Sequence, residues 1–386
     1  MRTLDQTDVA ERSDASIREL AQAIAANFRD ELGITGGRIY RWDDGNYELV
    51  GRFGRRKNGT IGIVVSDSYA PIVELIERGI IVMDRNDPSA DPNLERKLGA
   101  KRFAAIVVGD DDFVLSFDVS ESTPKEDIFL ALAIVRHAIN QKLRVSRFEA
   151  MIGEAQRIQQ SILPMKSPRF AGFDIFGRTV AAEHVAGDYY DFLKLSEKSL
   201  GIAVADATGH GLPAALVVRD IHMGLRMGAD RDFKIVRTVE KLNRIIHESR
   251  ISTKFVSLFY SELEASGTFV YANAGHPAPI LINGTEIEWL TSGGPVLGPT
   301  PNATYARGYV NIQPGGILCM YSDGITEAEN AKGEQFGEKR LERLLKACRA
   351  EDAKSIVKRI LEKVEDWDHG APDDRTVVVV RRLEAG

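Results

Sequence analysis

Four acidic clusters stand far apart in this sequence, each beside a segment with the apolar pattern of a β-strand. They are Gly187-Asp188-Tyr189-Tyr190-Asp191, Asp206-Ala207-Thr208-Gly209-His210-Gly211, Ser322-Asp323-Gly324 and Asp373-Asp374. Carboxylates at strand ends can converge on one point, where they repel one another unless a cation neutralises them. Hard oxygen ligands without Cys or His favour Mg²⁺ or Mn²⁺. The clusters therefore predict a two-metal hydrolase site, and phosphate esters are the usual substrates of such sites.

Any one cluster taken alone has a simpler explanation. A Ser-Asp-Gly or an Asp-Asp in a loop usually serves turn geometry, because Asp and Gly favour turns. The metal interpretation therefore depends on all the clusters together. The role of Asp191 stays open. It is a further metal ligand, a residue that contacts the ligands, or the first residue of a loop. Four glycines are expected to allow tight backbone near the metals: Gly209, Gly211, Gly275 and Gly324.

Composition limits the possible functions. With 386 residues the chain is long enough for two domains, and its 44% apolar and 27% charged residues are ordinary for a globular protein. The net charge of −6 argues against nucleic acid or an anionic membrane as a partner. The first residues lack the apolar stretch of a signal peptide, and no apolar run predicts a membrane helix. We expect a cytoplasmic protein with reduced Cys319 and Cys348.

The N-terminal part of the chain predicts a small α+β domain over about residues 14–140. A helix over residues 14–32 precedes the strands, and Asn58-Gly59 predicts a hairpin turn between two of them. The expected strands are Arg38–Trp42, Tyr47–Phe53, Ile61–Val65, Phe103–Gly109 and Phe113–Asp118, with a helix at Tyr69–Arg78. This order resembles a GAF or PAS-like sensor domain, with GAF preferred. Such domains hold a small ligand or serve as dimerisation scaffolds, and both functions stay open.

A long helix is predicted to follow this domain. Thr123-Pro124-Lys125-Glu126 is a capping box with proline at the first helical position, and the helix is expected to run on to Leu163-Pro164. Apolar residues in its second half recur at spacings of three and four: Phe148, Met151, Ala155, Ile158 and Ile162. This spacing favours a short parallel coiled coil and a homodimer over a helix that packs on its own domain. Such a helix could transmit a signal between domains.

The remainder of the chain predicts packed, largely antiparallel sheets flanked by helices, an α+β sandwich. The expected helices are Pro213–Met227, Phe233–Glu248, Glu338–Arg349 and Ala353–Glu365. The expected strands are Phe173–Val180, Tyr190–Leu195, Leu200–Asp206, Phe255–Leu263, Thr268–Asn273, Pro279–Ile282, Glu286–Leu290, Tyr305–Asn311, Ile317–Ser322 and Thr376–Arg382. We therefore expect a sensor domain over 1–140, a helical linker over 141–165 and a catalytic domain over 166–386.

Five motifs of the C-terminal part, with the helix before them, carry a family resemblance. The helix is Ala155-Gln156-Arg157-Ile158-Gln159-Gln160-Ser161-Ile162-Leu163-Pro164, and the motifs are Val185–Asp191, Asp206–Ala215, Asn273-Ala274-Gly275-His276-Pro277, Tyr321–Ala328 and Asp373-Asp374-Arg375-Thr376. In this order they resemble the SpoIIE/RsbU-type phosphatases, a bacterial branch of the PPM superfamily. The resemblance spans about residues 150–383. It implies a PPM-type sandwich and serine/threonine phosphatase activity.

The resemblance also implies roles for single residues. The implied metal ligands are Asp188, Asp206, the Ala207 carbonyl, Asp323 and Asp373. Asp206 would bridge two Mn²⁺ or Mg²⁺ ions, and Asp206 and Asp323 would be the catalytic residues. Asp374 is the alternative to Asp373. A water held between the metals would attack phosphorus, without a covalent phosphoenzyme.

Several nearby side chains have less specific implied roles. His210 is expected at the start of a helix rather than in catalysis, and His276 is expected to order a turn. His184 stands where the wider superfamily has a phosphate-binding Arg, which leaves the residue that receives the phosphate open. Three arginines form either a solvated helix face or a surface for an acidic partner: Arg219, Arg226 and Arg231.

These patterns predict a metal-dependent serine/threonine protein phosphatase with a regulatory N-terminal domain. The family resemblance implies that the substrate is a phosphorylated anti-anti-sigma (STAS) protein of a partner-switching pathway in stress or development. It also implies an upstream activator, either a protein or a small ligand. Two alternatives stay open: an inactive phosphatase-fold adaptor that binds regulatory partners, and a phosphatase of small metabolites.

Overall fold

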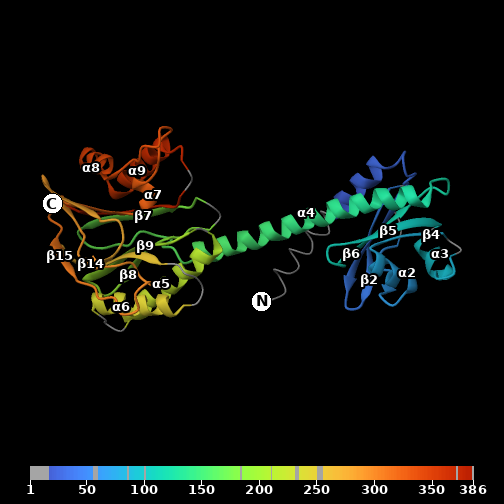
Figure 1. Ribbon diagram of the computed structural model, residues 1–386, viewed down its shortest axis with the longest axis horizontal. Coiled ribbons are helices and arrows are strands. Elements are labelled where there is room, and N and C mark those ends of the chain that lie inside the picture. Colours follow the sequence, from blue (N-terminus) through green and yellow to red (C-terminus); the bar gives the residue numbers. More distant parts are fainter. Residues whose placement is uncertain are drawn as a thin grey trace. The chain divides into compact units, whose positions relative to one another are not determined.

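The computed structural model describes residues 17–54, 60–84, 87–99, 101–182, 185–209, 211–230, 234–249, 255–370 and 373–384. It divides into two compact units, one ending at Ala150 and the other beginning at Met151 (Figure 1). The boundary falls within residues 141–165, where a linker was expected. None of the described helices is both long enough and apolar enough to cross a membrane.

The described part of the N-terminal unit contains a six-stranded antiparallel sheet in the order β3-β2-β1-β6-β5-β4. Successive residues of a strand point to opposite faces, so each strand contributes to two cores. Ala104 packs with one core and Ala105 with the other. The strands are β1 (Gly36–Asp43), β2 (Asn46–Gly54), β3 (Val64–Ser66), β4 (Ile80–Asp84), β5 (Arg102–Val108) and β6 (Phe113–Asp118).

Helices cover both faces of this sheet. Residues 17–27 and the first half of α4 (Lys125–Gln160) cover one face. Helices α2 (Ala70–Arg78) and α3 (Pro92–Leu98) cover the other. The sequence did not predict α3 or β4, and β3 is shorter than the expected Ile61–Val65. The predicted Asn58-Gly59 turn lies outside the described residues.

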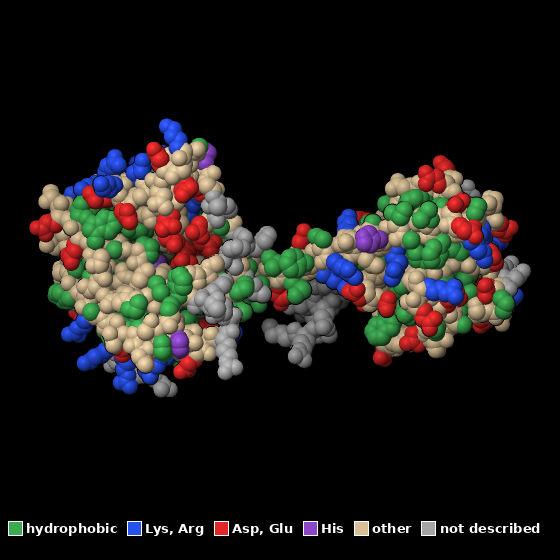
Figure 2. Space-filling view, in the orientation of Figure 1, with side chains coloured by type: hydrophobic (Ala, Val, Ile, Leu, Met, Phe, Trp, Pro, Cys, Tyr) green, Lys and Arg blue, Asp and Glu red, His purple; other side chains and the backbone are tan. Residues whose placement is uncertain are grey.

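Helix α4 ends at Gln160, slightly before the predicted Leu163-Pro164. Its first half packs into the N-terminal core through four apolar residues, Ile128, Leu132, Val135 and Ile139. Its second half exposes Val145, Phe148, Met151 and Ile158. Figure 2 shows apolar side chains gathered along this part of the helix. A Cβ added to Gly153 would meet no other group within 4 Å, so the surroundings of this residue do not require a glycine.

The C-terminal unit contains two packed sheets with helices on their outer faces (Figure 1). In the described residues the first has the order β14-β11-β10-β9-β8, with β15 paired to β11, and the second has the order β13-β12-β16-β17-β7. The first consists of β8 (Asp188–Lys194), β9 (Ser199–Ala207), β10 (Val256–Glu264), β11 (Thr268–Ala274), β14 (Gly293–Gly294) and β15 (Gly308–Asn311). The second consists of β7 (Phe173–Val180), β12 (Ile280–Asn283), β13 (Glu286–Trp289), β16 (Ile317–Tyr321) and β17 (Arg375–Arg382).

Three apolar cores hold these layers together. The core between the sheets includes Ile202, Phe259, Met320 and Val378. Helices α5 (Leu212–Asp230) and α6 (Ile235–Glu248) pack on the first sheet. Helices α8 (Glu338–Ala347) and α9 (Ala353–Trp367) pack on the second. Both cysteines are buried and unpaired. The layers agree with the predicted α+β sandwich.

Candidate metal centre

The two sheets bring the acidic clusters to one edge of the sandwich. Asp188 begins β8 and lies opposite Asp206 of β9 in the strand register. Asp323 begins α7 (Asp323–Thr326), two residues after β16, and Asp373 lies two residues before β17. Because β16 and β17 are neighbours, both clusters of the second sheet lie together. Acidic side chains show near α7 and the end of β9 in the space-filling view (Figure 2).

Hydrogen bonds across the sheets join these clusters directly. The Ser322 hydroxyl donates to Asp188 Oδ2 at 2.7 Å and accepts from the Thr376 backbone N–H at 2.9 Å. Asp188 is only 1% exposed, and its Oδ1 has no hydrogen-bond partner among the described residues. A buried carboxylate oxygen without a partner is unfavourable unless a cation or a donor approaches it. This unpaired oxygen is the observation that best supports a cation-binding site.

The carboxylates of the site already repel one another. Burial, followed by the charges of Asp323 and Asp373, raises the pKa of Asp206 to about 7. Burial and the charge of Asp206 raise the pKa of Asp188 well above its usual range. Burial and Asp373 likewise raise the pKa of Asp323. Divalent cations reverse such shifts because they stabilise the ionised carboxylates.

The described residues nevertheless contain no group of three or more His, Cys, Asp or Glu side chains that could hold a metal ion as they stand. The donor chemistry fits a hard cation: acidic oxygens, one of them unpaired, with backbone carbonyls nearby. Ala207 can contribute only its carbonyl oxygen, because its side chain is a methyl group without a donor atom; this methyl is buried in the core under α5. The acidic residues predicted from the sequence thus lie close enough for their charges to interact.

Asp373 and Asp374 differ in what their carboxylates contact. The Asp374 carboxylate accepts hydrogen bonds from the backbone N–H groups of Ala182, at 2.8 Å, and Gly187. Among the described residues, the exposed Asp373 accepts a hydrogen bond only from the adjacent backbone N–H of Asp374. Asp374 therefore fixes the backbone beside Asp188, and Asp373 keeps its carboxylate available. This difference favours Asp373 over Asp374 as the ligand.

Two glycines of the site are required by close backbone contact. A Cβ on Gly324 would lie 2.1 Å from the Asp374 carbonyl oxygen, and one on Gly187 would lie 2.8 Å from the Ala207 carbonyl oxygen. Gly209, Gly211 and Gly275 have positive φ angles of 85°, 76° and 68°, a region that other residues rarely adopt. The predicted tight backbone is thus present around the acidic clusters.

Asp191 lies within β8 and does not begin a loop. Its buried carboxylate accepts from Arg226 Nη2 at 2.9 and 3.2 Å and from the Tyr189 hydroxyl at 3.0 Å. His222 Nδ1 lies 3.1 Å from the same hydroxyl, and burial lowers the pKa of this histidine. Arg226 is therefore not simply part of a solvated helix face. The cluster of Asp191, Tyr189, His222 and Arg226 fastens α5 to the strand that begins with Asp188.

Of the histidines in the motifs, the structure describes His276, and its contacts indicate a structural role. His276 is buried, its Nδ1 lies 2.8 Å from Ser257 Oγ, and its backbone N–H donates to Asn273 Oδ1. Burial lowers the pKa of His276 to about 3, so it is neutral. It orders a turn, as the sequence indicated. His210, His184 and Arg231 lie outside the described residues, whereas Arg219 is exposed on α5.

Gln159 is a further contact to the site that the sequence analysis did not identify. Its side-chain amide donates to the Ala186 carbonyl oxygen and accepts from the Ala186 N–H at 2.9 Å. The last turn of α4 is thereby bonded to the segment immediately before Asp188. The one available signal was Gln159 itself, a polar residue within the predicted helix next to an apolar stripe.

Comparisons with known proteins agree with this architecture. Residues 196–383 match the family described as Stage II sporulation protein E (SpoIIE). Phosphoserine phosphatase RsbU of Bacillus subtilis is 29% identical over 235 residues, which cover 59% of this chain and 69% of RsbU. Phosphoserine phosphatase RsbP of the same organism is 22% identical over 153 residues, 38% of each chain.

Two solved structures share the fold. The RsbU and RsbW domains of a Mycobacterium tuberculosis protein match with a TM-score of 0.52 and 23% identity, covering 58% of this chain and 64% of that one. The SiaA-PP2C domain of Pseudomonas aeruginosa matches with a TM-score of 0.55 and 18% identity, covering 62% of this chain and 98% of that one. The predicted phosphatase-type sandwich is confirmed. Neither comparison assigns a fold to the N-terminal unit.

Proposed function

We propose that the C-terminal unit of this chain is a protein serine/threonine phosphatase domain similar to the SpoIIE family and to RsbU, and that two divalent cations, Mn²⁺ or Mg²⁺, bind at its acidic edge. The supporting observations are the unpaired Oδ1 of the buried Asp188, which lies opposite Asp206, and the interaction of the Asp206 charge with Asp323 and Asp373 of the second sheet. The proposed ligands are Asp188, Asp206, the Ala207 carbonyl, Asp323 and Asp373.

The chain's own residues hold this site in place. Ser322 orients Asp188 through its 2.7 Å hydrogen bond. Asp374 fixes the backbone at Gly187, and Asp206 lies where the charges of both sheets meet. Bound divalent cations supply an activated water and neutralise charge on the phosphoryl oxygens. The carboxylates must be ionised to hold the cations, so activity requires that their protons leave.

We further propose that the substrate is a phosphorylated STAS-domain protein and that an activator acts through the N-terminal unit. Support comes from the similarity to RsbU, which covers 69% of that protein. The family match begins at residue 196, so the N-terminal unit lies outside it and is available for a separate regulatory function. The GAF-like character of that unit remains part of this proposal.

The decisive experiment measures phosphate release from a phosphoserine STAS protein and from p-nitrophenyl phosphate, with Mn²⁺ or with EDTA. We expect turnover that needs Mn²⁺ and is lost in Asp206→Asn, while the control Asp127→Asn, at an exposed position of α4, keeps it. Preference for the protein over the small ester would support the protein substrate. Turnover that survives EDTA or Asp206→Asn would refute the metal mechanism. STAS-protein binding without turnover, even with an activator, would favour the adaptor.

We also propose a homodimer formed through the second half of α4. Its exposed apolar residues recur at the spacing of a coiled-coil seam. Met151→Glu places a charge in this seam and should convert the dimer to a monomer, as measured by light scattering after size exclusion. Ala150→Glu adds the same charge outside the seam and should leave the dimer intact. A wild-type protein that is monomeric, or equal loss in both variants, would rule out the seam.

A further inference from the structure

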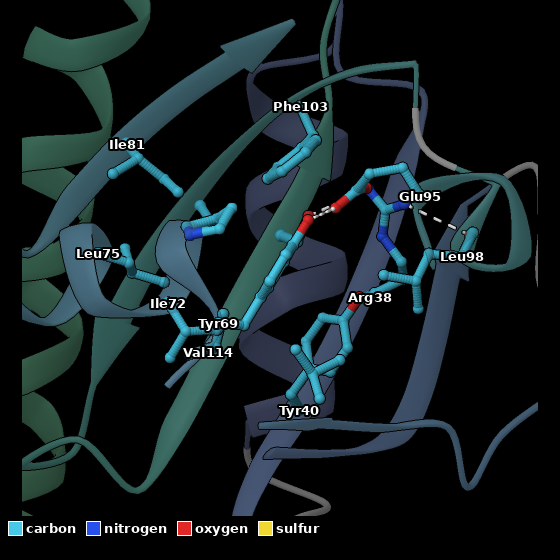
Figure 3. A pocket seen from close by; sticks show the side chains of 14 residues that line it. Arg38, Tyr40, Tyr69, Ile72, Leu75, Ile81, Glu95, Leu98, Phe103 and Val114 are labelled. Atoms are coloured by element: carbon cyan, nitrogen blue, oxygen red, sulfur yellow. Dashed lines mark hydrogen bonds between the residues drawn. The ribbon is translucent and has the colours of Figure 1, made fainter. Parts of the chain in front are cut away.

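The N-terminal unit contains a partly open cavity of about 40 Å³ between its sheet and the helices α2 and α3. Figure 3 shows its lining side chains, which come from both the strands and the helices. Most of them are apolar, including Ile72, Leu75, Ile81, Phe103 and Val114. Protein interiors are normally packed without spaces of this size. The cavity therefore calls for an occupant, either water or a small ligand.

One wall of the cavity is a buried arginine with an unsatisfied donor. Arg38 is 2% exposed, and its Nη2 donates to Asp118 Oδ1 at 2.7 Å and to Ser116 Oγ at 3.0 Å. Its Nη1 donates to the Leu98 carbonyl oxygen at 3.4 Å. The Nε–H has no hydrogen-bond partner among the described residues. A buried guanidinium N–H without an acceptor is unfavourable, so an occupant that supplies an acceptor oxygen is stabilised here.

Glu95 lies beside Arg38 on the same wall (Figure 3). It is 3% exposed, and its Oε1 accepts from the Tyr69 hydroxyl at 3.1 Å. The single hydroxyl hydrogen of Tyr69 is donated to Glu95, and the hydroxyl oxygen accepts from the Asp91 backbone N–H, so Tyr69 has no donor left for an occupant. Burial raises the pKa of Glu95 against the opposing effects of Tyr69 and Arg38. Glu95 therefore holds its proton more tightly than an exposed carboxyl does.

We propose that this cavity binds a short monocarboxylate of the size of acetate or propionate. Its carboxylate accepts a hydrogen bond from the Arg38 Nε–H, and its alkyl end contacts the apolar wall around Ile72 and Val114. Charge-assisted hydrogen bonds to a buried guanidinium are the contacts that distinguish a carboxylate from a neutral molecule of the same shape. The inference concerns the N-terminal unit and does not depend on the proposed phosphatase substrate.

The size of the cavity sets an upper limit on the ligand. One water molecule needs about 10 to 15 Å³ of cavity volume, so this cavity accepts a ligand about as large as three to four water molecules. Acetate and propionate fit this limit, whereas nucleotides and aromatic acids do not. Ala105 lines the cavity while its neighbour Ala104 packs on the opposite face, in the core that contains α4. The bound molecule would therefore border a strand that also supports α4.

Isothermal titration calorimetry of the full-length protein with sodium acetate and sodium propionate tests this assignment. Sodium chloride at equal ionic strength controls for salt, and 1-propanol controls for shape without charge. For ligands this small, we expect a Kd between about 0.1 and 10 mM. Ala105→Val adds two carbons to the cavity wall and should weaken binding at least about tenfold. Ala70→Val makes the same change at an exposed position of α2 and should bind like the wild type.

Three results would overturn the proposal. The absence of saturable heat with either carboxylate would show that the cavity holds water only. Equal binding by wild type and a folded Ala105→Val, with circular dichroism as the check on folding, would place the ligand elsewhere. Binding of 1-propanol as tight as that of propionate would show that Arg38 does not select a carboxylate.

Discussion

The contact between Gln159 and Ala186 leads to a quantitative prediction about the metal site. Gln159→Met keeps the length of the side chain but removes both hydrogen bonds to the Ala186 backbone. Gln159 is 6% exposed, so water cannot easily replace them. Leaving a buried donor and a buried acceptor unpaired costs about 1 to 3 kcal/mol for each group. We expect the variant to lose about 2 to 6 kcal/mol of unfolding free energy in the C-terminal unit.

The same change should reach the metal site, because Ala186 lies two residues before Asp188. A looser segment at residues 185–187 must be ordered again when cations bind. If about 1.4 kcal/mol of that cost falls on binding, the Mn²⁺ concentration for half-maximal activity rises about tenfold. Phosphate release measured over a Mn²⁺ series, together with urea denaturation, gives both quantities from one preparation.

Gln160→Met is the matched control, since Gln160 is the next residue of α4 and is exposed. It should change neither the stability nor the Mn²⁺ requirement. If Gln159→Met behaves like this control in both measurements, the amide does not position the segment before Asp188. If stability falls and the Mn²⁺ requirement stays unchanged, the contact stabilises the fold without acting on the metal site.

Two further predictions concern Asp191 and Glu95. Arg226→Met removes a charged hydrogen-bond donor from the buried Asp191 and should lower the free energy of unfolding, measured by urea denaturation, by about 1 to 3 kcal/mol. The control Arg219→Met, at an exposed position of the same helix, should lower it far less. Equal losses in the two variants would contradict the role of the cluster. Burial raises the pKa of Glu95 above its ordinary 4.5, so the folded state holds this proton more tightly than the unfolded state does. The resulting stability is complete below the ordinary value and is lost as pH rises through the raised pKa. Glu95→Gln keeps an acceptor for Tyr69, so its unfolding free energy relative to wild type should increase with pH in urea denaturation; a difference independent of pH would show that Glu95 ionises normally.

The sequence predicted the features that depend on local pattern. Alternating apolar residues identified most strands, and the acidic clusters at strand ends indicated one site because strand ends of packed sheets meet at common edges. The contacts of Asp191 with Arg226 and of Gln159 with Ala186 were not predictable in this way. Their partners lie 35 and 27 residues apart, and only the packing of α5 and α4 brings them together.

The features missed in the N-terminal unit have a similar cause. Strand β4 and helix α3 are short, and their residues carry too few turns or alternations to show a period. The cavity could not be predicted from the sequence either, because Arg38 and Glu95 are 57 positions apart in the chain and charged residues are rarely buried. Their burial against the apolar residues of α2 and α3 is a property of the packed domain alone.

The position of β17 has a consequence for how the protein is made. This strand comes after every other strand in sequence, yet it lies inside its sheet, between β16 and β7. During synthesis β7 has no neighbour in that sheet until residues 375–382 leave the ribosome, and the segment with Asp373 and Asp374 emerges just before them. An incomplete chain thus exposes strand edges that can pair wrongly. The acidic edge is assembled only after residues 373–382 have been made, so shorter nascent fragments carry no finished centre.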